Sequence, residues 1–126
     1  MTTKYDPNNV FAKIIREEIP CARVYEDSKI LAFHDISKAA PLHILVVPKG
    51  EYISFADFTD NALDEEIVDF FKKVRQIATL LGLDKSGYRL ITNNGLDASQ
   101  TVSHFHVHIL GGKKLGGLLL SDNLTR

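Results

Sequence analysis

The sequence contains one cysteine, no tryptophan and no long apolar run. A single cysteine, Cys21, cannot form an internal disulfide, which suits a reducing compartment. No stretch approaches the ~20 consecutive apolar residues of a membrane helix, and residues 1–6 lack the apolar region of a signal peptide. We therefore expect a cytoplasmic protein that has no membrane partner.

An excess of charge of either sign is also missing. The 15 basic and 16 acidic side chains give a formal net charge of -1, which provides no electrostatic footprint for nucleic acid. The length of 126 residues fits one domain with one core, and 44% hydrophobic and 25% charged residues are typical of a globular protein. We expect a single domain over residues 1–126, with a variable tail from about residue 113 and no nucleic-acid partner.

The spacing of the apolar residues predicts an α+β domain with a mainly antiparallel sheet. A short helix is expected to start at Asp6-Pro7 and to end before Pro20. A longer helix is expected over about 59–81, because its apolar residues recur at helical spacing and a glycine follows it. Five strands are predicted, over residues 23–26, 30–35, 42–48, 88–92 and 103–110.

A run of alternating polar and apolar residues lies near the C-terminus. Its sequence is His104-Phe105-His106-Val107-His108-Ile109-Leu110, followed by two glycines. On a strand, successive side chains point to opposite faces, so the three imidazoles would share one face and the apolar residues the other. Three imidazoles on one face offer no obvious stability, and the run is therefore a candidate functional site.

Three interpretations of this face are open. The histidines could simply face water, although three at alternate positions are hard to obtain by accident. They could bind zinc, but the first and last are ~13 Å apart along a strand, so two of them would need His43 to complete a site. A neutral imidazole is also a good nucleophile near pH 7, and the polar loop upstream offers Gly95, Ser99 and Thr101 to a phosphate. Phosphoryl or nucleotidyl transfer fits best.

The run resembles the signature of the histidine-triad family, His-φ-His-φ-His-φ-φ with φ apolar. The resemblance to the nucleotide-binding (Hint) branch covers nearly the whole chain from residue 10 to 114. It is carried by residues 10–20, 32–37, 40–48, 88–90, Asn93 and 110–112.

The resemblance implies a five-stranded, mainly antiparallel sheet with two helices (HIT-like), and a homodimer whose sheets join into one of ten strands. It also implies hydrolysis of purine nucleoside phosphoramidates, with release of AMP or GMP through a covalent nucleotidyl-histidine and without a metal or other cofactor. Two alternatives stay open: a purine nucleotide-binding regulatory module with weak or no turnover, and a zinc-binding interaction module.

By position, the resemblance implies that His106 attacks the α-phosphorus and that His108 binds the phosphate and helps to protonate the leaving amine. His104 and His43 would support and orient the triad. Asp35 would accept hydrogen bonds from the ribose hydroxyls. The base pocket would be lined by Val10, Phe11, Ile14, Ile19, Phe33 and Ile36, and the phosphate and leaving-group side would be contacted by Asn93, Ser99 and Thr101.

The residues themselves leave a simpler interpretation beside some of these roles. The apolar ones could be core residues, and Asp35 could be a turn residue at a strand end. Alternation puts Phe33 and Asp35 on one strand face and His34 on the other, so we expect His34 to be structural. The sequence also departs from many relatives, which have Gly where Ser99 stands and Ser where Thr101 stands.

Overall fold

A computed structural model describes residues 4–118 of the chain. One antiparallel sheet of five strands, in the order β1-β2-β3-β5-β4, organises the fold. The predicted α+β architecture is therefore confirmed, with one helix more than expected. The elements are α1 (Val10–Ile15), β1 (Arg23–Glu26), β2 (Ile30–His34), β3 (Leu42–Pro48), α2 (Phe55–Asn61), α3 (Asp64–Leu80), β4 (Arg89–Ile91), the 3-10 helix η1 (Leu96–Ala98) and β5 (Val107–Gly111).

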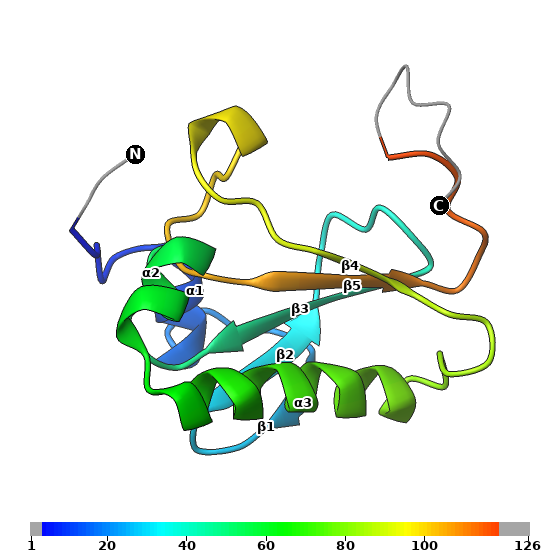
Figure 1. Ribbon diagram of the computed structural model, residues 1–126, viewed down its shortest axis with the longest axis horizontal. Coiled ribbons are helices and arrows are strands. Elements are labelled where there is room, and N and C mark those ends of the chain that lie inside the picture. The colour runs from blue at the N-terminus through cyan, green and yellow to red at the C-terminus, as the bar shows by residue number, and fades with distance from the viewer. Residues whose placement is uncertain (1–3, 119–126) are drawn as a thin grey trace.

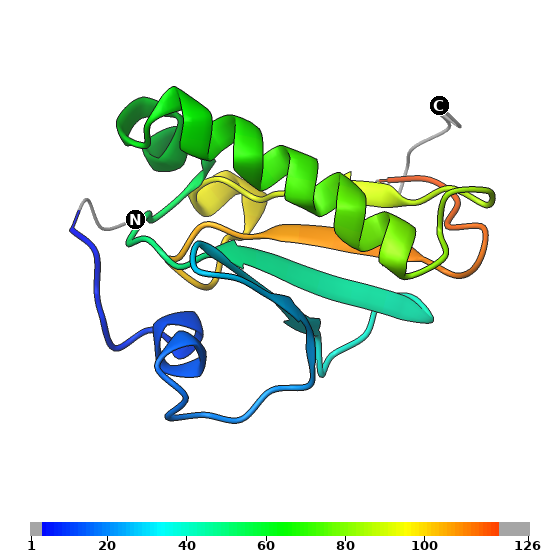
Figure 2. The same cartoon turned by 90° about the horizontal axis from the view of Figure 1, so that it is seen from below.

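The sheet separates two layers of helix, as Figure 2 shows, with α3 on one side and α1 on the other. Side chains that alternate along β2, β3 and β5 point to α3 from one set of positions and to α1 from the other. The α3 side buries the larger cluster, made of Ile30, Ala32, Ile44, Val46, Phe58, Phe70, Val74, Ile77, Leu83, Phe105, Val107 and Ile109. The α1 side buries Phe11, Ile14, Leu31, Phe33, Leu45 and Val47.

The first helix starts later than the sequence predicts. Asp6 begins a turn instead of the helix: its carboxylate accepts the N–H of Asn8, and its carbonyl accepts the N–H of Asn9. Asn9 is the N-cap, because its side chain accepts the N–H of Ala12 at 2.9 Å. The helix also ends early, at Ile15, and Glu17 then adopts a left-handed backbone with φ 65°.

The long helix predicted over 59–81 is two helices. Ser54 caps α2 by accepting the N–H of Asp57, and Asp57 in turn accepts the N–H of Ile53 at 2.7 Å. Ala62 and Leu63 are both extended, with ψ 154° and 148°, and separate α2 from α3. Figure 1 shows α3 running across the sheet and α2 as a separate short helix beside its beginning.

The last strand, predicted over 103–110, is shorter than expected and contains only one of the three histidines, His108. β5 starts only at Val107, where its pairing with β3 begins opposite Val46. Pairing with β4 begins one residue later, between Ile91 and His108. His104 and His106 lie before the strand, in a segment held by separate bonds: the N–H of Phe105 donates to the Tyr52 carbonyl, and the Thr92 hydroxyl donates to the His106 carbonyl. The alternation nevertheless persists, since Phe105 packs in the α3-side cluster.

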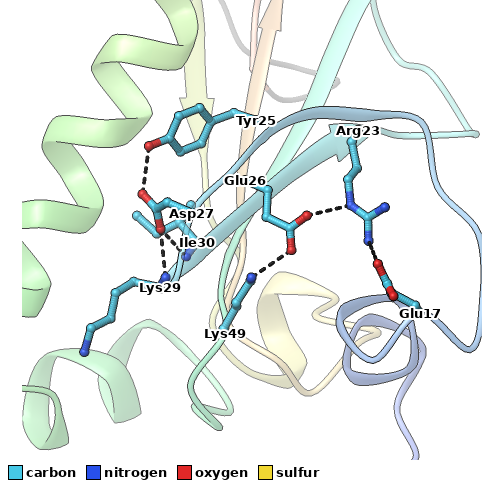
Figure 3. A network of polar contacts seen from close by, with 8 residues as sticks. All are labelled: Glu17, Arg23, Tyr25, Glu26, Asp27, Lys29, Ile30 and Lys49. Atoms are coloured by element: carbon cyan, nitrogen blue, oxygen red, sulfur yellow. Dashed lines mark hydrogen bonds and ion pairs between the residues drawn. The ribbon is translucent and has the colours of Figure 1, made fainter.

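The β1 edge of the sheet is covered by charged side chains (Figure 3). Arg23 pairs with Glu26 at 2.9 Å and with Glu17 at 3.1 Å, and Lys49 pairs with Glu26 at 2.7 Å. Charged side chains on an edge strand oppose pairing with another chain.

Within residues 4–118, no helix combines the length and apolarity needed to cross a membrane. Of the tail expected from residue 113, residues 119–126 lie outside the described residues.

Candidate functional site

The ring of His106 has one nitrogen bonded and one available. Nδ1 lies 2.7 Å from the carbonyl oxygen of His104, so Nδ1 carries the proton and Nε2 has the lone pair. Nε2 makes no hydrogen bond in the described part of the chain. Every fully buried side-chain nitrogen or oxygen in that part has a hydrogen-bond partner, so Nε2 is not fully buried. Nε2 therefore reaches the surface of the site, although the side chain as a whole is only 8% exposed. Burial lowers the pKa of His106 and keeps the ring neutral at pH 7.

His104 is held at both ring nitrogens. Nε2 donates to the carbonyl oxygen of Pro48 at 2.8 Å, and Nδ1 accepts the hydroxyl proton of Tyr5 at 2.6 Å. The side chain is 1% exposed. Burial lowers the pKa of His104 to about 4, despite the opposing hydrogen bond to Pro48. This imidazole is therefore a neutral structural element of the site.

His43 and His108 form a directed pair, with 2.8 Å between Nε2 of His43 and Nδ1 of His108. The N–H of Ala39 donates to Nδ1 of His43 at 3.0 Å, so the proton of His43 is on Nε2 and points at His108. Nδ1 of His108 is then the acceptor, and its Nε2 carries a proton. The rings of His108 and His106 lie 5.1 Å apart between centroids. Burial, followed by the neighbouring rings of His106 and His43, lowers the pKa of His108 to about 4.

Asp35 follows β2 and lies beside this pair. One carboxylate oxygen accepts the N–H of Ser37 at 2.8 Å, and the other is 3.4 Å from Nε2 of His43. The first bond is the turn chemistry that a strand-end aspartate is expected to make. The second oxygen faces the imidazole pair.

Asp35, His43 and His108 could together present three ligand atoms to a metal ion, since these atoms lie within 4.8 Å of one another. A metal on Nε2 of His43 would need the proton of that ring on Nδ1. Nδ1 already accepts the N–H of Ala39. The hydrogen bond from Ala39 therefore opposes metal binding at Nε2 of His43.

An apolar cavity of about 160 Å³ adjoins the imidazoles. Phe11 connects the two: it borders the cavity, and its ring packs edge-on against that of His106 at 4.9 Å. Asp35 borders the cavity as well. The lining comprises Val10, Phe11, Ile14, Ile19, Pro20, Cys21, Phe33, His34, Asp35, Ile36 and Leu45.

All six apolar residues expected around a base therefore border one cavity. Phe11, Ile14 and Phe33 also belong to the buried α1-side cluster, so the pocket and core interpretations both apply to them. Ile36 is 98% exposed at the rim. His34, which alternation assigned to the opposite face, also borders the cavity, because β2 ends there and the chain turns.

The structure does not connect the three predicted loop residues to the hydrogen-bonded imidazoles. Asn93 is half-buried, and Ser99 and Thr101 are exposed. No hydrogen bond joins these three side chains to the imidazoles in the described part of the chain. Ser99 has a left-handed backbone, with φ 59° and ψ 39°, a conformation that glycine adopts at lower cost.

Sequence reasoning missed three contacts of the site. Tyr5 comes from the N-terminal segment, 99 residues away from His104, and no local pattern reveals that hydrogen bond. The packing of Phe11 against the imidazoles is equally non-local. Leu45 was within reach, since β2–β3 pairing places it opposite Phe33 and beside His108.

The fold and the site define an α+β protein in which one sheet gathers four imidazoles beside an apolar cavity. The sequence profile of the HIT domain matches residues 16–115. An uncharacterised HIT-like protein of Rickettsia prowazekii is 56% identical over 119 residues, which cover 94% of this chain and 99% of that protein. The chain belongs to the HIT domain family, and the resemblance seen in the sequence is confirmed.

Solved structures agree with this assignment. A HIT family hydrolase from Clostridium thermocellum is 40% identical with a TM-score of 0.78, over 90% of this chain and 97% of that one. A histidine triad nucleotide-binding protein from Candida albicans is 28% identical with a TM-score of 0.78, over 94% of this chain and 87% of that one.

Proposed function

We propose that the protein is a purine nucleoside phosphoramidase in which His106 is the nucleophile. The observation that carries this proposal is the pattern of ring hydrogen bonds. It leaves a lone pair on Nε2 of His106 and a proton on Nε2 of the adjacent His108. A nucleophile and an acid on neighbouring rings are what the cleavage of a P–N bond requires.

In the proposed reaction, Nε2 of His106 attacks the α-phosphorus and forms a P–N bond to the enzyme. The P–N bond to the leaving amine breaks, and the amine takes the proton from Nε2 of His108. Water then attacks the same phosphorus and gives a proton back to Nε2 of His108. The nucleoside monophosphate leaves, and His106 regains its lone pair.

His43 supports both steps in this scheme, because its Nε2–H donates to Nδ1 of His108 and preserves the tautomer that carries the acidic proton. His104 fixes the carbonyl that orients His106. Asn93, Ser99 and Thr101 are proposed to contact the phosphate and the leaving group, on the strength of the resemblance.

The cavity supports the choice of a nucleotide substrate. Its apolar walls suit the faces of a heterocyclic base, and Asp35 at the lining offers a carboxylate oxygen to the ribose hydroxyls. The names of two similar structures, a HIT family hydrolase and a histidine triad nucleotide-binding protein, agree with hydrolysis and with nucleotide binding.

The test is to trap the intermediate. Protein mixed with an adenosine phosphoramidate and quenched within one turnover should carry one AMP, and peptide mass spectrometry should locate it on His106. Calorimetry with AMP gives the matching binding constant. Binding of AMP with neither turnover nor adduct would contradict the phosphoramidase and favour the regulatory nucleotide-binding module.

We also propose that two copies pair through β4 to form a ten-stranded sheet. The ion pairs of Arg23, Glu26 and Lys49 cover the β1 edge, whereas β4 ends the sheet with Leu90 46% exposed. On α3, Val68 and Phe71 are exposed and border a surface hollow of about 580 Å³. An unprotected edge and exposed apolar side chains suit an interface between copies.

Sedimentation velocity should show a dimer at micromolar concentration, and Leu90→Glu should shift the protein to monomer. Glu26→Lys, which places an altered charge on the opposite edge, is the matched control and should leave the dimer intact. A wild-type monomer at tens of micromolar would contradict the pairing. The cytoplasmic location stays a prediction.

A further inference from the structure

The N-terminal segment contributes one side chain to the imidazole cluster. The Tyr5 hydroxyl lies 2.6 Å from Nδ1 of His104, and the two rings meet edge-on with centroids 5.6 Å apart. Because Nε2 of His104 donates to the Pro48 carbonyl, Nδ1 has no proton, and the Tyr5 O–H is the donor. Burial raises the pKa of Tyr5, so the hydroxyl keeps its proton at neutral pH.

The segment that carries Tyr5 is itself anchored. The Asp6 carbonyl accepts both the main-chain N–H and the side-chain amide of Asn9. Arg16, just beyond α1, donates to the Pro7 carbonyl at 2.8 Å. The Tyr5 hydroxyl therefore approaches His104 from a fixed direction, and Phe11 of α1 packs against the same imidazole at 6.4 Å.

The hydrogen bond between Tyr5 and His104 affects His106 through the peptide group that joins His104 to Phe105. The carbonyl of His104 accepts the Nδ1–H of His106 at 2.7 Å. The N–H of the same peptide group, that of Phe105, donates to the Tyr52 carbonyl at 2.7 Å. A side chain fixed at both ring nitrogens leaves residue 104 little freedom to turn this peptide, and the peptide in turn sets the direction of Nε2 of His106.

We propose that Tyr5 is a positioning residue, which together with the Pro48 carbonyl holds the His104 ring in place and thereby keeps the nucleophilic nitrogen of His106 aimed at the substrate phosphorus. This inference rests on the function proposed above. Tyr5 is not among the residues that line the cavity, and its contacts with the imidazole cluster in the described chain are those with His104. We therefore expect Tyr5 to act on His106 through His104. The titratable groups that face His104 in the described chain are Tyr5 and His106.

The test is Tyr5→Phe, which keeps the ring and removes the hydroxyl. We expect kcat on the adenosine phosphoramidate to fall by about tenfold, because the nucleophile is less well oriented, with KM unchanged. Neutral His104 loses the bond that its Nδ1 accepts, so its pKa should rise from about 4. The acidic limb of the kcat profile should move to higher pH accordingly.

One measurement and one control variant separate this role from a merely structural one. Long-range ¹H–¹⁵N spectra should show Nδ1 of His104 as a hydrogen-bonded acceptor in the wild type and as an altered resonance in Tyr5→Phe. Tyr25→Phe is the matched control, since it removes a tyrosine hydrogen bond to Asp27, away from the imidazoles. It should change neither the spectrum nor kcat. The wild-type spectrum shows whether the hydrogen bond between Tyr5 and His104 exists, even if Tyr5→Phe proves unstable.

Failures of the two proposals are distinguishable. An active wild type with an unchanged His104 resonance, kcat and pH profile in Tyr5→Phe would overturn the positioning role alone. A wild type without turnover would overturn the phosphoramidase, and the spectra would then still support or overturn the hydrogen bond by which Tyr5 holds the His104 ring.

Discussion

The two faces of the sheet are built by the same strands but carry opposite kinds of chemistry. Toward α3, the rings of Phe58, Phe70 and Phe105 pack with centroids 4.7 to 5.2 Å apart. Toward α1, the segment that holds Phe105 presents His104 and His106, each buried and hydrogen-bonded. Burial on the first face stabilises the fold by removing apolar surface from water. On the second face, burial lowers the pKa of the imidazoles and the hydrogen bonds fix their tautomers, as the proposed reaction requires.

The largest expected effect separates activity from stability on the α1 side. His106→Asn should lower kcat on the phosphoramidate by roughly 10³-fold or more, because it removes the attacking lone pair. Nucleotide affinity by calorimetry and the thermal unfolding midpoint should stay near wild-type values, and these serve as controls. A variant that keeps a substantial fraction of the wild-type rate would remove His106 from the role of nucleophile.

On the α3 side we expect the opposite result, in which a substitution lowers stability more than activity. Phe70→Ala deletes a ring that is 1% exposed and leaves a cavity among Phe58 and Phe105. The free energy of unfolding should fall by about 3–5 kcal/mol, as measured by urea denaturation. The kcat of the remaining folded protein should change much less. An unfolding free energy within 1 kcal/mol of wild type would mean that this face is not the main source of stability.

Acid should weaken the fold through the imidazole face. Burial holds the pKa of His104 and of His108 at about 4, below the ordinary value of 6.5. Between these values the unfolded chain binds protons that the folded chain does not, so the free energy of unfolding falls as pH falls from 6.5 to 4. For His104 alone the loss is of the order of 3 kcal/mol.

Urea denaturation at a series of pH values measures this slope, and His104→Gln should flatten part of it. A free energy of unfolding that is constant between pH 7 and 4 would contradict the burial of neutral imidazoles.

The smallest effect is expected outside both faces. Ser99 is exposed and has φ 59°. Ser99→Gly should remove backbone strain while adding flexibility to the unfolded chain, and these terms partly cancel. The free energy of unfolding should rise by at most about 1 kcal/mol. Thr101→Ser, at an exposed neighbouring position, is the control that leaves the backbone unaltered. A marked loss of stability in Ser99→Gly would show that the Ser99 side chain is needed.

The local sequence pattern was sufficient to predict β2 and β3, because alternation and a continuous apolar run are properties of a few consecutive residues. It failed where two signals competed. Asp6-Pro7 has the composition of a helix start, but Asn9 lies closer to the apolar stripe and caps α1. The Ser54 and Asp57 cap of α2 was available in the sequence, and the strong periodicity of α3 obscured it.

The candidate site likewise contains residues that the sequence indicated and contacts that it did not. The sequence pointed to the imidazoles, to Asp35 and to the apolar lining, and the structure brings these groups together. The resemblance also pointed to Asn93, Ser99 and Thr101, whose side chains make no hydrogen bond to the imidazoles in residues 4–118. The contribution of Tyr5 depends on a hydrogen bond across 99 residues, and no local signal indicates it.

The sequence by itself determined which side chains share a face along most of the strands, because alternation along an extended chain is a local geometric property. It misplaced His34, where β2 ends. The sequence also indicated the family, because the spacing of the histidines is a feature of a few consecutive residues. Only the tertiary structure decided which ring nitrogen carries a proton. That choice depends on donors and acceptors contributed by Tyr5, Ala39 and Pro48, which meet the imidazoles only once the sheet and the N-terminal segment have packed.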